Sequence, residues 1–308
     1  MTAEKRRFDN IDIARGFAML VIIEWHAIGI HTSWTDGWVM PIFFIIMGIF
    51  YKQEESFRAM AIKKINTIVV PMLVFSIPMF FISLCEKGVV PTMMRLLNPY
   101  GMLHGVSWFL LCTLWCYAIN YLLHKYIRSR VWLFLIMLAL SASSFYISTY
   151  SYHGHRLVLP LFCSTALTAI GYLAIGELAK KIFLYKGGYS IIFILAGLSV
   201  FIFLPSGIQN NLWNQYEDNW LKLMFVGAFE SLAIIQICHF SPKGLGIIGK
   251  LSILILLLHP YIVMLLAPLS LNRWLSYSII SISTIILSYL LNKYVPQLCG
   301  FKPLIKLS

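Results

Sequence analysis

The chain has 308 residues, of which 59% are hydrophobic and 12% are charged, and its formal net charge is +12. Soluble domains are about half apolar and about a quarter charged, so this composition excludes an ordinary water-soluble domain. The excess apolar surface requires lipid as its solvent. We therefore expect a single integral membrane domain over residues 1–308, with no soluble domain outside the membrane.

The N-terminal end carries three basic residues at positions 5–7 ahead of an apolar segment, as a signal peptide does. Asp12 and Arg15 interrupt that arrangement, and no small-residue cleavage site follows. The sequence therefore predicts that this first apolar segment is kept as a transmembrane helix.

Apolar segments of about 20 residues, long enough to cross a bilayer, recur along the chain. Ten can be marked, near residues 14–31, 37–51, 65–85, 105–123, 131–148, 157–179, 189–207, 220–240, 251–269 and 275–292. The second segment is short for a complete crossing. The pattern predicts an all-α fold, a polytopic transmembrane bundle of about ten helices.

Basic residues concentrate in alternate connections between these segments, which tests the number of helices. With the N-terminus in the cytoplasm, 18 of the 24 basic residues fall in inner segments and Arg15 lies in the first helix. The remaining five fall in outer segments: Lys87, Arg95, Arg156, Lys222 and Arg273. The positive-inside rule thus predicts cytoplasmic N- and C-termini, and it explains the net charge without a nucleic-acid partner.

Two patterns that could carry chemistry are better explained by packing or turns. The six cysteines lie mostly inside apolar segments, and Cys112 and Cys116 have no further soft ligand nearby, so we predict apolar packing and no metal site. The Gly-x-Gly-x-x-Gly run at 244–249 follows no strand and opens no βαβ unit. We expect a short cytoplasmic turn there rather than a dinucleotide site.

The outer connections contain aromatic and histidine residues. Trp213, Tyr216 and Trp220 lie in or beside the polar segment 208–219. They are either ordinary interfacial aromatics or rings that stack on sugars. We expect His153 and His155 to be solvated loop residues.

The first predicted helix carries an unusual density of ionisable residues, namely Asp12, Arg15, Glu24 and His26. Such residues are costly inside a membrane and are usually functional. The eleven positions from Arg15 to His26 return to nearly the same helix face, about 16 Å apart along the axis. Asp12 lies one turn before Arg15 and can pair with it.

His26 is the candidate general base, because a neutral imidazole can accept a proton near neutral pH. Glu24 is only two residues away and faces another side of a helix, so it is a weaker candidate for orienting His26. The alternative is a structural histidine whose polar atoms are satisfied by a neighbouring helix.

Residues 12–16 read Asp-Ile-Ala-Arg-Gly, and ten residues separate Arg15 from His26. This pattern resembles the opening signature of the acyltransferase-3 family of membrane acyltransferases. Four later elements are also similar to family patterns: Phe-Phe-Ile-Ile-Met-Gly at 43–48, a basic segment at 57–64 leading to Pro71, Ser-Trp-Phe-Leu at 107–110, and residues 249–260 with Leu-His-Pro at their end. Two positions depart from the family, since Met47 replaces the usual serine and Leu256 replaces a common aromatic.

The resemblance implies transfer of an acyl group, often acetyl, from cytoplasmic acyl-CoA to a glycan or lipid-linked sugar at the outer face. Coenzyme A is a polyanion, so basic residues at the inner surface are expected to bind it, and arginine suits bidentate phosphate contacts. The candidates are Arg15, Arg58, Lys63 and Lys64. For the last three, the alternative is simple anchoring of the topology.

Two later residues are further candidates for the donor site. His259 lies just before Pro260 in the ninth segment, and the family resemblance makes it a site residue. The alternative is a hydrogen bond between helices. Trp108 belongs to the Ser-Trp-Phe-Leu element, and its alternative role is packing at the membrane interface.

The sequence thus predicts a membrane O-acyltransferase, specifically an acetyl-CoA-dependent O-acetyltransferase acting on a cell-surface or lipid-linked glycan, in a bacterial cytoplasmic (inner) membrane. Its partners would be acetyl-CoA, the saccharide acceptor and membrane lipids, with a homo-oligomer left open and no nucleic acid. One alternative is a transporter or flippase for a glycan precursor, with Arg15 and His26 lining a path. Another is a structural protein of an envelope assembly, which leaves the intramembrane charges unexplained.

Overall fold

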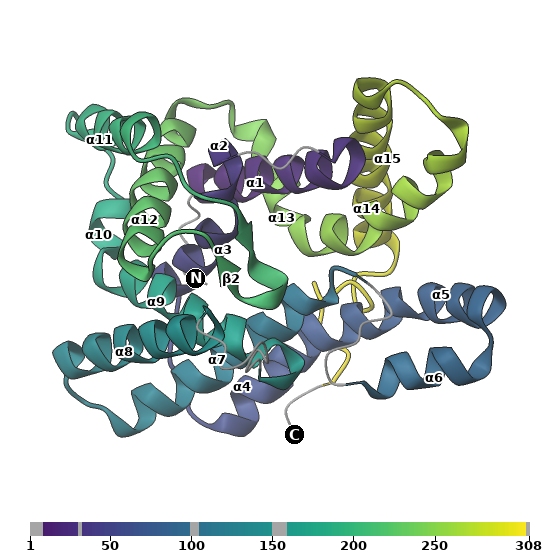
Figure 1. Cartoon of the computed structure of the whole chain (residues 1–308), viewed down its shortest axis with the longest axis horizontal. Helices are drawn as coiled ribbons and strands as arrows, with labels where there is room; N and C mark the ends of the chain where they lie inside the picture. Colours follow the sequence, from purple (N-terminus) through teal and green to yellow (C-terminus); the bar gives the residue numbers. More distant parts are fainter. Residues whose placement is uncertain (1–8, 30–32, 99–104, 150–158, 306–308) are drawn as a thin grey trace, which may run out of the picture.

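The computed structural model describes residues 9–29, 33–98, 105–149 and 159–305. Figure 1 shows a predominantly helical chain. Several predicted features fall outside the described residues: the basic residues at positions 5–7, His153, His155 and Arg156.

Each of the ten predicted apolar segments overlaps one α-helix over most of its length. In chain order these are α1 (Asp9–Ile28), α3 (Val39–Ile49), α5 (Val70–Lys87), α7 (Ser107–Tyr126), α8 (Arg130–Thr149), α9 (Cys163–Leu178), α11 (Ser190–Phe203), α12 (Trp220–Ile237), α14 (Ser252–Leu266) and α15 (Arg273–Tyr294).

Six helical stretches among the described residues are long and apolar enough to cross a membrane. They are Phe57–Lys87, Arg130–Ser148, Pro160–Leu178, Trp220–Phe240, Ser252–Leu269 and Arg273–Tyr294, and α3 and α11 are shorter apolar helices. The chain is therefore an integral membrane protein of the all-α class. Ten crossings and cytoplasmic termini stay predictions.

Short elements connect these helices. They are α2 (Ser33–Asp36), α4 (Phe57–Lys64), α6 (Val89–Leu97), α10 (Lys180–Phe183) and α13 (Gly246–Lys250), with 3-10 turns at Pro160–Phe162, Asn211–Trp213, Cys238–Phe240, Lys243–Leu245 and Ala267–Leu269. Two short strands, β1 (Gln209–Asn210) and β2 (Gln215–Tyr216), form an antiparallel hairpin that pairs Gln209 with Tyr216.

A π-helical turn, Ile65–Val69, joins α4 to α5. Proline has no N–H, so Pro71 cannot donate the α-helical hydrogen bond to the carbonyl of Thr67. The N–H of Val70 instead donates to the carbonyl of Ile65, five residues back. The wider turn is thus explained by the proline that follows it.

Asn66 in this turn is buried and holds the main chain near the C-terminal end. Its Oδ1 accepts from the N–H groups of Leu304 and Ile305 at 2.7 and 2.8 Å, and its Nδ2 donates to the carbonyl of Ile305 at 2.8 Å. One side chain therefore satisfies three main-chain groups of a segment 239 positions away.

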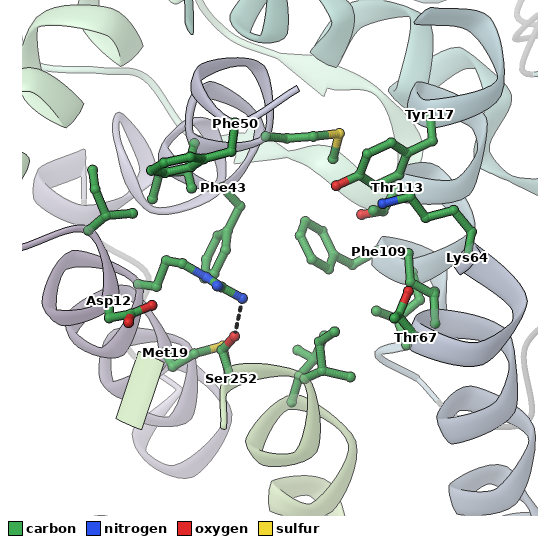
Figure 2. A pocket seen from close by; sticks show the side chains of 18 residues that line it. Asp12, Met19, Phe43, Phe50, Lys64, Thr67, Phe109, Thr113, Tyr117 and Ser252 are labelled. Atoms are coloured by element: carbon green, nitrogen blue, oxygen red, sulfur yellow. Dashed lines mark hydrogen bonds between the residues drawn. The ribbon is translucent and has the colours of Figure 1, made fainter. Parts of the chain in front are cut away.

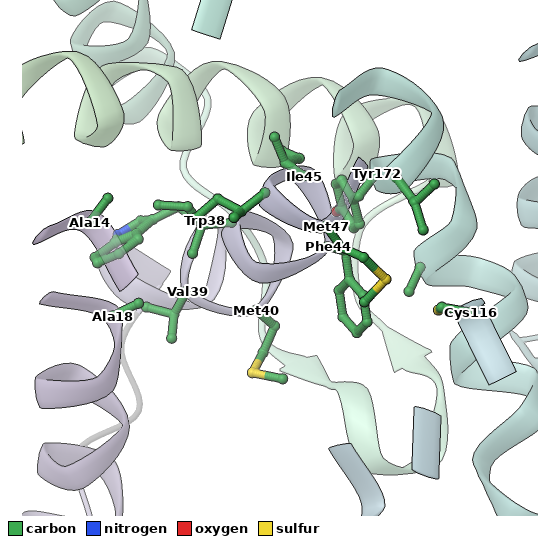
Figure 3. Packing of buried hydrophobic residues seen from close by; sticks show 14 of the residues in the cluster. Ala14, Ala18, Trp38, Val39, Met40, Phe44, Ile45, Met47, Cys116 and Tyr172 are labelled. Carbon is green, nitrogen blue, oxygen red and sulfur yellow. The ribbon is translucent and has the colours of Figure 1, made fainter. Parts of the chain in front are cut away.

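Helix α3 is apolar on every side and lies in the core, as expected of a helix with no polar face. All of its residues except Phe43 are buried. Paired glycines let it pack closely on α9, because a Cβ on Gly48 would lie 2.1 Å from the carbonyl oxygen of Leu173, and a Cβ on Gly176 equally close to that of Ile45. Figure 3 shows α3 packed against Ala14 and Ala18 of α1, Cys116 of α7 and Tyr172 of α9.

The cysteines take mostly the packing role predicted for them. Four are buried, Cys163 is partly buried and Cys85 is exposed in the described structure; the four are Cys112, Cys116, Cys238 and Cys299. The exposed position of Cys85 on α5 differs from a packing role within the protein.

The glycine run at 244–249 forms a 3-10 turn followed by α13, which packs on α1. A Cβ on Gly249 would lie only 1.7 Å from the carbonyl oxygen of Asp12, and one on Gly16 would lie 2.9 Å from the backbone nitrogen of Gly249. These glycines therefore allow two backbones to approach closely at the level where α1 begins.

We expect Gly249→Ala to lower the melting temperature of the purified protein in detergent by several degrees. The added methyl group overlaps a backbone atom, so α1 and α13 must move apart, at a cost of about 1–3 kcal/mol. Gly244→Ala is the matched control in the same turn, because a Cβ there meets no atom within 4 Å. Equal melting temperatures for the two variants would contradict the close packing described here.

Candidate functional site

Helices α1 and α14 contact each other through polar side chains at two positions along their length. Near the start of α1, Nη2 of Arg15 donates to Oγ of Ser252 at 2.7 Å. About three turns further along, the ring of His26 meets that of His259 edge to face, with centroids 4.8 Å apart and planes at 66°. Ser252 and His259 are seven residues apart, so one face of α14 carries both partners.

The two histidines hold the same ring orientation. Nδ1 of His26 lies 2.8 Å from the carbonyl oxygen of Ile22, and Nδ1 of His259 lies 2.9 Å from that of Ile255. A carbonyl oxygen can only accept, so Nδ1 carries the hydrogen in both rings, and Nε2 is the basic nitrogen of each neutral imidazole. His259 is fully buried, whereas His26 is exposed to a cavity.

A cavity of about 540 Å³ surrounds Arg15, and we call it the Arg15 cavity. It combines two cations, Arg15 and Lys64, with Asp12 and apolar walls (Figure 2). Nζ of Lys64 lies 3.2 Å from the centre of the Tyr117 ring, a cation–π contact that holds the ammonium group at the wall. The cavity can therefore take an anionic group beside an apolar chain.

A second cavity of about 500 Å³ surrounds His26, and we call it the His26 cavity. Trp25 and Trp108 line it together with the hairpin residues 208–212. Gln209 is 9% exposed, and neither its Oε1 nor its Nε2 has a hydrogen-bond partner in the described part of the chain. A buried amide without partners next to a cavity is suited to contact a polar ligand.

The hairpin is fixed to the helices behind it. The fully buried Asn214 donates to Oγ of Ser148 at 2.9 Å, and Oγ1 of Thr165 donates to the carbonyl of Asn211 at 2.8 Å. The ring of Tyr216 stacks on Phe145 with centroids 5.4 Å apart. The hairpin therefore forms a stable wall of the His26 cavity.

The three aromatic residues of this outer segment do not line the His26 cavity. Tyr216 is held between the hairpin and α8, and Nε1 of Trp220 donates to Oγ of Ser141 at 2.9 Å. Trp213 is 40% exposed. The sugar-stacking interpretation is therefore not supported for Tyr216 or Trp220, whose contacts are structural.

Three of the predicted site residues, Arg58, Lys63 and Glu24, line neither cavity. Lys63 forms an ion pair with Glu54, and this hydrogen bond lowers the pKa of the Glu54 carboxyl. Neither Lys63 nor Arg58 lines the Arg15 cavity, and Arg58 is exposed on α4. Glu24 lines neither cavity and is close enough to Tyr277 of α15 to interact with it electrostatically. The roles predicted for these residues stay predictions.

Sequence reasoning included Ser252 only as part of the family-like element 249–260 and gave it no role, and it missed Gln209. Ser252 stands four residues before Leu256 and seven before His259, and this helical spacing places the three on one face of α14. Gln209 lies among several polar residues of one connection, and nothing in the local sequence distinguishes it. In the described parts of the chain, no three His, Cys, Asp or Glu side chains converge in a way that could hold a metal ion.

Comparison with protein families identifies the family of the chain, whereas comparison with individual proteins does not. No curated protein and no solved structure matches the chain. The family model described as an acyltransferase domain matches residues 8–293, which include every residue lining the two cavities. The resemblance seen in the sequence is thereby confirmed, and the chain belongs to the acyltransferase-3 family of membrane acyltransferases.

Proposed function

We propose that this membrane acyltransferase moves an acetyl group from cytoplasmic acetyl-CoA to a hydroxyl group of a cell-surface or lipid-linked glycan. The observation that carries the proposal is the pair of adjoining cavities along α1, one beside the cation Arg15 and the other beside the base His26. Nothing in the fold or the comparisons supports the alternative of a transporter or flippase. The basic inner connections and the family favour a bacterial cytoplasmic membrane.

In this proposal the donor enters the Arg15 cavity. Arg15 and Lys64 supply positive charge for phosphate groups of the donor, and Ser252 fixes the direction of the guanidinium group. The exposed Arg58 and Lys63 of α4 would add positive charge nearer the membrane surface. The axial distance of about 16 Å between Arg15 and His26 leaves room for an extended thioester arm between the two ends.

His26 is the general base of the proposed reaction. Its Nε2 takes the proton of the acceptor hydroxyl while the hydroxyl oxygen attacks the thioester carbon. The new C–O bond forms, the C–S bond breaks, and the proton passes from His26 to the departing thiolate. The products are the ester and free coenzyme A thiol, so the step needs no other reactant.

His259 is the positioning residue for His26. Its ring lies against the imidazole, while the carbonyl of Ile22 holds Nδ1 and directs Nε2 away from the helix backbone. We assign the orienting role to these two contacts rather than to Glu24, which lines neither cavity. Both interpretations of His259, a site residue and a contact between helices, then describe the same interaction.

The acceptor would occupy the His26 cavity. Trp25 and Trp108 offer flat apolar surfaces, and Gln209 and Asn211 offer amide donors and acceptors. That combination suits a sugar, which has apolar C–H faces and polar hydroxyl edges. Trp108 is thereby proposed to contact the acceptor side of the reaction rather than the nucleotide of the donor.

We expect His26→Ala to reduce acetyl transfer to the glycan in purified membranes by about 10²–10⁴-fold, because it removes the general base. The measurement is radiolabelled acetyl incorporation at equal protein level. His239→Gln is the control, since His239 contacts Asn10 and lines neither cavity. Transfer that survives in the His26→Ala variant would exclude this role.

We expect Arg15→Ala to weaken binding of acetyl-CoA by about tenfold or more, as loss of a charged hydrogen bond to a phosphate costs about 1.5–3 kcal/mol. Isothermal calorimetry of the purified protein measures it. Arg273→Ala is the control. Arg273 is exposed at the start of α15 and lines neither cavity, so this substitution should leave the affinity unchanged.

Acetyl-CoA should also raise the melting temperature of the wild-type protein through binding to the folded state. A protein that neither binds nor is stabilised by acetyl-CoA would contradict the proposed donor and revive the flippase alternative.

A further inference from the structure

The Arg15 cavity and the His26 cavity share four lining residues: Met19 of α1, Phe43 of α3, Phe109 of α7 and Leu256 of α14. All four are apolar, and each comes from a different helix. We call these four residues the septum. Figure 2 shows Met19, Phe43 and Phe109 around the Arg15 cavity.

The septum lies between the two polar contacts of α1 and α14. Met19 follows Arg15 by four residues and precedes His26 by seven, while Leu256 follows Ser252 by four and precedes His259 by three. Each helix therefore places a polar group, an apolar side chain and a histidine in succession along one face. The apolar pair stands where the two cavities adjoin.

Two of the septum side chains are buried and the other two contact each other. Met19 and Leu256 are 1% and 6% exposed. The partly buried rings of Phe43 and Phe109 meet edge to face with centroids 5.5 Å apart. All four side chains are apolar, and a passage lined by such side chains is of the kind that excludes water.

The proposed reaction requires the acyl donor to extend through the septum. The reacting groups must lie about 3–3.5 Å apart, so the thioester carbon has to reach the hydroxyl held by His26. The phosphates of the donor are held near Arg15, on the other side of the septum. The arm that joins phosphate to thioester must therefore pass between the four septum side chains.

We propose that the septum is the binding site for the thioester arm of the acyl donor, and that its side chains close the passage when no arm lies in it. This inference rests on the proposed function for the identity of the arm. Methionine has three rotatable bonds and repacks readily, so Met19 is the side chain that gives way. The septum then keeps the two cavities from joining into an aqueous path across the membrane.

The barrier is tested with the purified full-length protein in sealed vesicles that contain a pH-sensitive dye. After an imposed pH step, Met19→Ala/Leu256→Ala should let protons cross at least tenfold faster than wild type, because both substitutions open the shared wall. A thioether analogue of acetyl-CoA, which cannot transfer its acetyl group, should slow that leak by occupying the passage.

The matched control is Met40→Ala/Leu110→Ala. It removes the same atoms from similarly buried positions, since Met40 is 6% and Leu110 is 1% exposed. Of the two cavities, Met40 lines only the His26 cavity and Leu110 only the Arg15 cavity. These vesicles should remain as tight as wild type. Equal leaks in the two double variants, or no leak in either, would overturn the proposal.

Single variants test the proposal if the double variant does not fold. Met19→Ala alone should leak more than Met40→Ala alone. Met19→Phe replaces the flexible side chain by a rigid ring and should slow acetyl transfer at least tenfold while the vesicles stay tight. Unchanged transfer by Met19→Phe would show that no arm passes there. If the wild-type protein transfers no acetyl group at all, the proposed function is wrong. The difference in proton leak between the septum variants and their controls then still tests whether the septum is a barrier.

Discussion

A charged or polar side chain buried among apolar helices has to find a partner, and this requirement governs how α1 sits in the protein. Arg15 is held by Ser252, and His26 lies against His259. Both partners belong to α14, more than 230 positions away in the chain. The need for partners thus favours one arrangement of the two helices, in which polar groups meet at two positions along their length.

The cavities exist because the helices approach one another unevenly. Backbones touch where glycine removes the side chain, as at Gly249 against Asp12 and Gly48 against Leu173. Elsewhere long side chains such as Phe43 and Phe109 hold the helices apart. Close contact at the glycines and bulky side chains elsewhere are consistent with space between helices that otherwise pack densely.

Much of this architecture could be predicted from local sequence. Apolar length located ten helical segments, six of them in stretches able to cross a membrane, because an apolar segment in lipid has to satisfy its backbone hydrogen bonds internally. Helical periodicity placed Arg15 and His26 on one face, since the spacing of residues along a helix is fixed. Proline and glycine likewise explain the π turn before Pro71 and the contact at Gly249.

Other features depend on contacts between distant segments and could not be predicted. The pairing of Arg15 with Ser252 depends on which helix lies beside α1, and so does the orientation of Glu24 away from both cavities. The outer segment was expected to be an irregular loop with sugar-facing or interfacial rings. It folds instead into a hairpin, because Asn214 and Tyr216 find partners in α8.

The hydrogen bonds of Asn66 with Leu304 and Ile305 have a consequence for the design of experiments on this protein. Asn66 is followed directly by Thr67 and Ile68, which line the Arg15 cavity, so the last described residues are tied to the wall of that cavity. Ile11 and Asp12 at the start of α1 line the same cavity, so both ends of the described chain lie close to the proposed donor site. A reporter group attached at either end would therefore stand near that site, where its signal could respond directly to donor binding.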